Sequence, residues 1–164
     1  MIYDIISTGS KGNAVVINDK ILIDCGVPFK KLSRVYESLS IVLLTHKHTD
    51  HFNKRTIKKL AEERPTLRFA CGKWLVPDVV KCGVKKRNID VVESGKIYDY
   101  KAFKISPFTL YHDVENIGLN YSQVSRHKKA HFFGGAGYFV CSQYKASASF
   151  GVSILSVPCG LFVL

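Results

Sequence analysis

Three histidines and one aspartate lie within six residues, in the pattern H-x-H-x-D-H formed by His46, His48, Asp50 and His51. His46 and His48 are two residues apart, so in extended backbone both side chains point to the same side and can bind one metal ion. Asp50 and His51 come where the chain turns, and they can face a second cation nearby. Imidazole and carboxylate together suit zinc, with manganese and iron as alternatives. The spacing predicts a metal centre, and a surface histidine cluster without function is the competing interpretation.

The residues on either side predict the elements that position this motif. Residues 41–44, Ile-Val-Leu-Leu, form a compact apolar run that is typical of a buried strand. Residues 53–64 predict a helix that has Asn53 as its N-cap and stops at Pro65. The motif therefore lies between the end of a strand and the start of a helix.

Strands and helices alternate over the first 115 residues, which predicts an α/β fold. Short β-rich runs predict further strands at residues 2–7, 14–17, 21–23, 67–70, 89–92, 96–100 and 103–106. Further helices are predicted at residues 28–39 and 73–81.

The length and composition are those of one globular domain. The chain has 164 residues, of which 46% are hydrophobic and 23% are charged. These values exclude a chain that is disordered throughout, a collagen-like protein and a disulfide scaffold. The formal net charge of +11 favours polyanionic partners such as nucleic acid, nucleotides or anionic lipid, with solubility as the alternative explanation.

The five cysteines form no C-x-x-C pair, and the N-terminal residues lack the charged and apolar regions of a signal peptide. These features predict free thiols in a cytoplasmic protein.

The last part of the chain differs from the rest, because no aspartate or glutamate follows Glu115. Residues 146–164 carry no charge and approach the length of a membrane span. Serines, glycines and Pro158 interrupt this stretch, so no membrane span is expected. We predict that residues 122–164 form an atypical tail that arose by truncation or by a frameshift.

Several short motifs occur in a fixed order around the histidines. They are S-T-G-S-K-G-N-A at residues 7–14, L-I-D-C-G at 22–26, H-x-H-x-D-H at 46–51, and S-P-F at 106–108 followed by His112-Asp113 and Gly118. In these motifs the chain resembles the metallo-β-lactamase-fold hydrolases, and especially their small stand-alone bacterial and phage members. The resemblance covers residues 1–121 and implies an αββα sandwich, of which this chain holds the N-terminal portion.

The resemblance also implies roles for individual residues. His46, His48 and His112 would bind the first metal ion. Asp50 and His51 would begin a second site, with Asp50 as the catalytic carboxylate that orients the attacking water.

Four further residues near these motifs receive candidate roles. The resemblance implies that Asp24 orients a ligand histidine, whereas a turn carboxylate at a strand end is the alternative. Lys11 and Lys47 would place positive charge on a bound phosphate, or are simply solvated. Asp113 could cap a turn.

The chain departs from the family pattern in its last third. The family has a later aspartate that bridges both metals and a final histidine, and this sequence has no acid after Glu115. We assign no ligand role to His127 or His131.

The predicted function is metal-dependent hydrolysis of a phosphodiester, with nucleic acid as the partner and zinc as the cofactor. Acyl substrates remain an alternative, because a fold does not determine its substrate. A non-catalytic metal- or nucleic-acid-binding remnant of such an enzyme is the rival interpretation. The sequence leaves the oligomeric state open.

Overall fold

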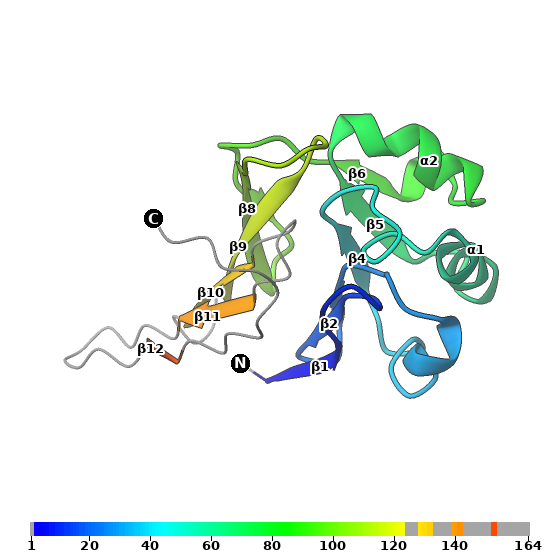
Figure 1. Ribbon diagram of the computed structural model, residues 1–164, viewed down its shortest axis with the longest axis horizontal. Coiled ribbons are helices and arrows are strands. Elements are labelled where there is room, and N and C mark those ends of the chain that lie inside the picture. The colour runs from blue at the N-terminus through cyan, green and yellow to red at the C-terminus, as the bar shows by residue number, and fades with distance from the viewer. Residues whose placement is uncertain (1, 124–127, 133–138, 143–151, 154–164) are drawn as a thin grey trace.

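Two six-stranded β-sheets form the framework of the protein in the computed structural model (Figure 1), which describes residues 2–123, 128–132, 139–142 and 152–153. The first sheet has the strand order β1-β2-β3-β4-β5-β6. Its strands are β1 (Tyr3–Ser7), β2 (Ala14–Ile17), β3 (Ile21–Ile23), β4 (Ile41–Leu44), β5 (Arg68–Cys71) and β6 (Ile89–Val91). The first three strands are antiparallel neighbours, and β3 to β6 run parallel.

The second sheet is antiparallel and has the order β12-β11-β10-β9-β8-β7. Its strands are β7 (Tyr98–Asp99), β8 (Phe103–Thr109), β9 (Ile117–Gln123), β10 (Lys128–Phe132), β11 (Phe139–Ser142) and β12 (Val152–Ser153). The sequence patterns predicted β7 and β8 but none of the four strands after them.

The helices lie on the side of the first sheet that faces away from β8 and β9 (Figure 1). They are α1 (Lys54–Glu63), α2 (Val76–Lys81) and the short 3-10 helices η1 (Phe29–Leu32), η2 (Lys73–Leu75) and η3 (Lys86–Asn88). The predicted N-cap of α1 is confirmed, because the Asn53 side chain accepts a hydrogen bond from the Thr56 N–H.

Alternation along the strands divides the apolar side chains between two cores. Val42 and Leu44 of β4 face the helices, where they pack with Ile57 of α1. Ile41 and Leu43 face the second sheet. Because both faces of β4 are covered, the strand is apolar at every position, as the sequence indicated.

The predicted helix over residues 28–39 is wrong. Only Phe29–Leu32 forms a 3-10 helix, and turns continue to Ser38. Most backbone hydrogen bonds here join residues three apart, such as Ser33 N–H to Lys30 O and Val35 N–H to Leu32 O. Serine in such a segment favours turns over a helix interior, because its side chain competes for backbone groups.

The α/β class and the two sheets expected from the sequence are confirmed. Within the residues that the structure describes, no helix covers the outer face of the second sheet and no helix is long and apolar enough to cross a membrane. The tail predicted at residues 122–164 contributes β10, β11 and β12. Apart from residues 152–153, the charge-free stretch at 146–164 lies outside the described residues.

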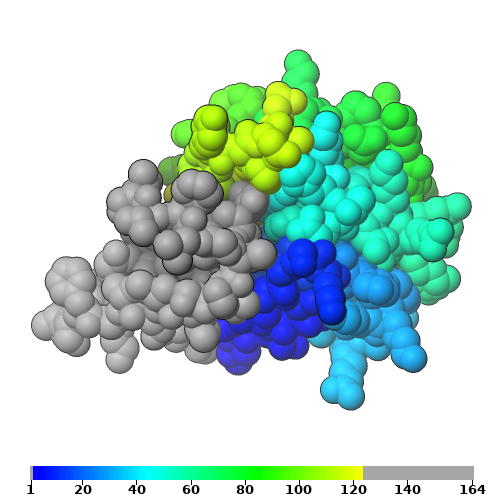
Figure 2. Space-filling view, in the orientation of Figure 1, coloured from blue at the N-terminus to red at the C-terminus, as the bar shows by residue number. Residues whose placement is uncertain are grey.

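In the space-filling view the N-terminal turns, the loop after β4 and the β8–β9 region adjoin on one face (Figure 2).

Candidate metal centre

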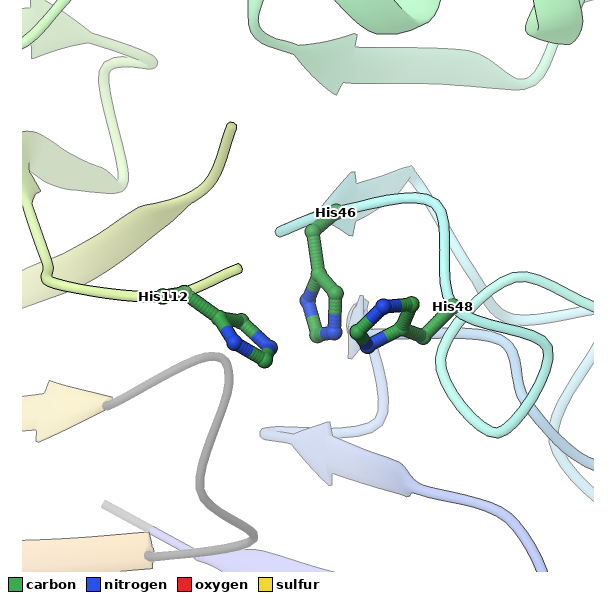
Figure 3. A group of neighbouring side chains, drawn as sticks. All are labelled: His46, His48 and His112. Atoms are coloured by element: carbon green, nitrogen blue, oxygen red, sulfur yellow. The ribbon is translucent and has the colours of Figure 1, made fainter. Parts of the chain in front are cut away.

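His46, His48 and His112 come together between the two sheets' loops and point toward one another (Figure 3). One nitrogen from each ring can be chosen so that all three lie within 4.8 Å of one another. His46 and His48 belong to the loop that follows β4, and His112 belongs to the loop between β8 and β9. The structure therefore places together the three residues for which the sequence predicted a shared metal ion.

Parallel strand pairing explains why the loops after β3 and β4 converge. The two strands end at the same edge of the sheet, with Ile23 paired to Leu43. The Asp24 N–H donates to Leu43 O at 2.8 Å, which sets Asp24 beside Thr45. The Ile117 N–H donates to Thr45 O at 3.2 Å, and this bond joins the start of β9 to the same edge.

The donor atoms of this cluster fit a metal ion. Nε2 of His46 and Nε2 of His112 are buried and have no hydrogen-bond partner among the described residues. A buried imidazole nitrogen without a partner is costly, and coordination of a cation would satisfy it. Three imidazoles suit zinc, with manganese and iron as further candidates.

His46 is prepared to act as a neutral ligand. Its side chain is buried, and burial, together with the adjacent His51, lowers its pKa to about 4 although Asp24 opposes the shift. Its Nδ1 lies 2.9 Å from the Thr45 hydroxyl oxygen, so Nε2 is the nitrogen left for a metal.

A second cluster of polar side chains, formed by Asp24, Asp50 and His51, adjoins the three histidines. Nδ1 of His51 lies 2.6 Å from Asp24 Oδ2, and its Nε2 lies 3.4 Å from Asp50 Oδ2. Burial alone would lower the pKa of His51, but the charge and hydrogen bond of Asp24, with a contribution from Asp50, raise it above its ordinary value. The structure thus brings Asp50 and His51 together and sets Asp24 against the imidazole of His51.

Asn13 links the N-terminal turn to this second cluster, and sequence reasoning assigned it no role. Its Nδ2 lies 3.1 Å from Asp50 Oδ2 and 3.0 Å from His51 Nε2. Its Oδ1 accepts a hydrogen bond from the Gly9 N–H. The signal that could have found it is the polar Asn at the end of the glycine-rich turn, since a buried side chain amide there must find partners.

Gly26 allows these loops to approach closely. Its N–H donates to Asn13 O at 2.9 Å, and a Cβ at this position would overlap the carbonyl oxygen of Asp50. The glycine of the L-I-D-C-G motif is therefore required by space rather than by an unusual backbone angle.

The two candidate phosphate-binding lysines, Lys11 and Lys47, lie on loops that carry residues of the site, but their side chains are exposed. Neither forms an ion pair with any residue that the structure describes. Their predicted role stays a prediction. His127 lies outside the described residues, and for His131 only the backbone, in β10, is described.

The fold is shared with solved structures of low sequence identity. The metallo-beta-lactamase fold protein YhfI from Bacillus subtilis superposes with a TM-score of 0.63 and 19% identity, over 79% of this chain and 59% of that one. The short form of human tRNase Z superposes with a TM-score of 0.62 and 15% identity, over 88% of this chain and 70% of that one. This chain therefore spans less than two thirds of the length of YhfI.

Sequence similarity to a curated protein is confined to a short region. The cytidine monophosphate-N-acetylneuraminic acid hydroxylase of Xenopus laevis is 40% identical over 58 residues, which are 34% of this chain and 10% of the hydroxylase. A family model described as a beta-lactamase superfamily domain matches residues 12–146, most of the chain. With that match, the two facing sheets and the histidine cluster at their loops, the chain belongs to the beta-lactamase superfamily and has the metallo-β-lactamase fold.

Proposed function

We propose that this protein is a metal-dependent hydrolase that cleaves phosphodiester bonds, with nucleic acid as its substrate. The observation that carries the proposal is the cluster of His46, His48 and His112, in which two buried Nε2 atoms have no partner within the described residues. The superfamily supports a metal-dependent hydrolase in general. The nuclease-like activity and a place in the small bacterial and phage branch are part of the proposal.

His46, His48 and His112 would hold the cation, which we propose is zinc. A divalent cation there would supply Lewis acidity, which lowers the pKa of water toward neutrality and polarises a phosphoryl oxygen. The low pKa of His46 keeps its imidazole neutral at physiological pH, so no proton must leave before it binds.

Asp50 would orient the attacking water and accept its proton. Its carboxylate is half-buried, and Asn13 Nδ2 donates to its Oδ2 at 3.1 Å, which holds the carboxylate in the loop that also carries His46 and His48. Asp50 and His51 would also begin a second cation site, with Asp24 holding the ring of His51. Lys11 and Lys47 would neutralise phosphate charge from the exposed loops.

Two observations support a nucleic-acid substrate. The formal net charge of +11 attracts a polyanion over long range. The structural neighbour from human is a tRNase Z, although at 15% identity it shares only the fold with this chain. A cytoplasmic location is part of the same proposal.

Metal content and turnover test the proposal together. We expect purified wild type to bind zinc or manganese and to hydrolyse a chromogenic phosphodiester slowly. His46→Ala should lose most of the bound metal, and Asp50→Ala should lower turnover by about 100-fold or more, the range of a lost general base. Asp99→Ala is the matched control, because Asp99 pairs with Lys104 at the far end of β8 from the histidines.

A non-catalytic metal- or nucleic-acid-binding remnant is the second candidate. It is favoured by residues 116–164, which contain no aspartate or glutamate that could bridge two cations. Metal binding with no difference in turnover between wild type and Asp50→Ala would support the remnant and contradict the hydrolase. Equal metal content in wild type and His46→Ala would contradict the hydrolase and the metal-binding form of the remnant.

A further inference from the structure

The carboxylate of Asp113 contacts two of the three clustered histidines. Its Oδ1 lies 2.6 Å from Nδ1 of His112, and its Oδ2 lies 3.4 Å from Nε2 of His48. Asp113 and His112 share the loop between β8 and β9, whereas His48 follows β4 in the other sheet. Sequence reasoning gave Asp113 no more than a turn-capping role.

We propose that Asp113 is a positioning residue that selects which ring nitrogens of His112 and His48 face the metal. This inference rests on the proposed metal centre. A carboxylate can only accept, so the nitrogen beside it carries the proton and the other nitrogen keeps its lone pair. On His112 this places the proton on Nδ1 and leaves the buried, partnerless Nε2 as the ligand atom.

The same reasoning assigns the ligand atom of His48. With Nε2 facing Asp113, Nδ1 is the nitrogen available to the cation. The arrangement matches a general feature of metal sites, in which a carboxylate holds the second nitrogen of a ligand histidine and thereby fixes its tautomer and ring orientation.

Adjacency in sequence does not by itself account for these contacts. Residue 113 would lie near residue 112 in any loop, but the contact with His48 joins the loops of two different sheets. The carboxylate thus contacts both imidazoles, whose centroids lie 4.9 Å apart. Because the Asp113 side chain is 68% exposed, water weakens its effect.

Three variants test the assignment: Asp113→Ala, Asp113→Asn and Glu115→Ala. Glu115 is the matched control, since it is an exposed acid of the same loop and its removal changes the net charge equally. The first readout is the tautomer of His112 in the metal-free protein, from the nitrogen chemical shifts of its ring. The second is zinc affinity, measured by competition with a chromogenic chelator. Neither readout requires turnover.

We expect His112 to carry its proton on Nδ1 in wild type and to shift toward the Nε2 form, which imidazole prefers in water, in Asp113→Ala. Zinc affinity should fall about tenfold in that variant, the lower end of the range for such partners, and by much less in Glu115→Ala. Asp113→Asn should restore part of both, because its amide oxygen can still accept from Nδ1.

An unchanged tautomer in Asp113→Ala, or equal losses of zinc affinity in Asp113→Ala and Glu115→Ala, would overturn the inference. A wild type with the expected tautomer that nevertheless binds no zinc would instead overturn the proposed function and leave the positioning contact intact.

Discussion

Thr45 connects the carboxylate of Asp24 to His46, one of the three proposed metal ligands. Its N–H donates to Asp24 Oδ1 at 2.9 Å, and its hydroxyl oxygen lies 2.9 Å from both Asp24 oxygens and from Nδ1 of His46. A hydroxyl has one proton, which goes to the carboxylate, so its oxygen must accept from the His46 Nδ1–H. This buried threonine therefore sets the tautomer of His46.

Replacement of Thr45 by valine tests that role, because valine keeps the shape and removes the hydroxyl. We expect Thr45→Val to lose about 1–3 kcal/mol of unfolding free energy, the cost of leaving buried polar groups without a partner. Zinc affinity should fall as well, and Thr45→Ser should recover most of both losses. Denaturant unfolding and chelator competition measure these effects, and a Thr45→Ser as impaired as Thr45→Val would contradict the role of the hydroxyl.

The pH dependence of the metal-free protein follows from His46. Its pKa is about 4 in the folded state and about 6.5 in the unfolded state, so between these values only the unfolded chain binds the proton. Folding stability should therefore be lost as the pH falls from 6.5 toward 4. His51, with a raised pKa, acts in the opposite direction, since its contribution is complete below pH 6.5 and is lost at higher pH.

Comparison with His46→Asn isolates the first effect. As the pH falls from 6.5 toward 4, the unfolding free energy of the wild type should decrease relative to that of this variant. A difference that stays constant with pH would show that His46 titrates normally in the folded protein.

At the scale of elements, the site depends on close backbone contact between the loop after β3 and the loop after β4. Gly26 lies against the loop of Asp50 and His51, while the Cys25 N–H donates to His51 O and the Asn53 N–H donates to Cys25 O. The start of α1 and the end of β3 are thereby fixed to the histidine loop.

Substitution of Gly26 should disturb this contact. A Cβ in Gly26→Ala would overlap the backbone of Asp50, which cannot move without displacing His51. We expect a loss of about 2 kcal/mol or more in unfolding free energy, the range for overpacking, together with weaker zinc binding. Gly83→Ala is the control, because Gly83 has a φ of 89° but no atom lies within 4 Å of the position that a Cβ would take. This variant should cost about 1 kcal/mol of unfolding free energy and leave zinc binding unchanged.

At the scale of the molecule, the charge of +11 predicts the response of nucleic-acid binding to salt. The logarithm of the affinity for a single-stranded or duplex oligonucleotide should fall linearly with the logarithm of the salt concentration. If Lys11 and Lys47 contact phosphates, each alanine variant should reduce the slope by about 1. Lys104→Ala is the control, because Lys104 is paired with Asp99. A flat salt response would mean that the charge serves solubility.

Local patterns were sufficient to predict the strand and helix that flank the histidines. Residues 41–44 are apolar on both faces, and Asn53 and Pro65 delimit α1, so these elements follow from interactions between residues close in sequence. The helix expected over residues 28–39 did not form beyond Phe29–Leu32, because apolar residues at helical spacing do not exclude successive turns, which the serines favour. The strands after residue 115 were missed although each pairs with the strand that precedes it in the chain, because stretches such as Lys128–Phe132 lack the compact apolar run that marks β4.

The sequence by itself determined the residue types of the metal centre: the spacing of His46 and His48 made a shared ion the natural chemistry, and the motif order pointed to His112 and Asp24. Only the tertiary structure decided which atoms meet. Parallel pairing of β3 with β4 set Asp24 beside Thr45, and the bond from Ile117 to Thr45 brought the His112 loop across from the second sheet. The contacts of Asn13 and Asp113 join segments that are far apart in the chain. Asn13 meets Asp50 between two loops of the first sheet, whereas Asp113 meets His48 only because the two sheets pack together.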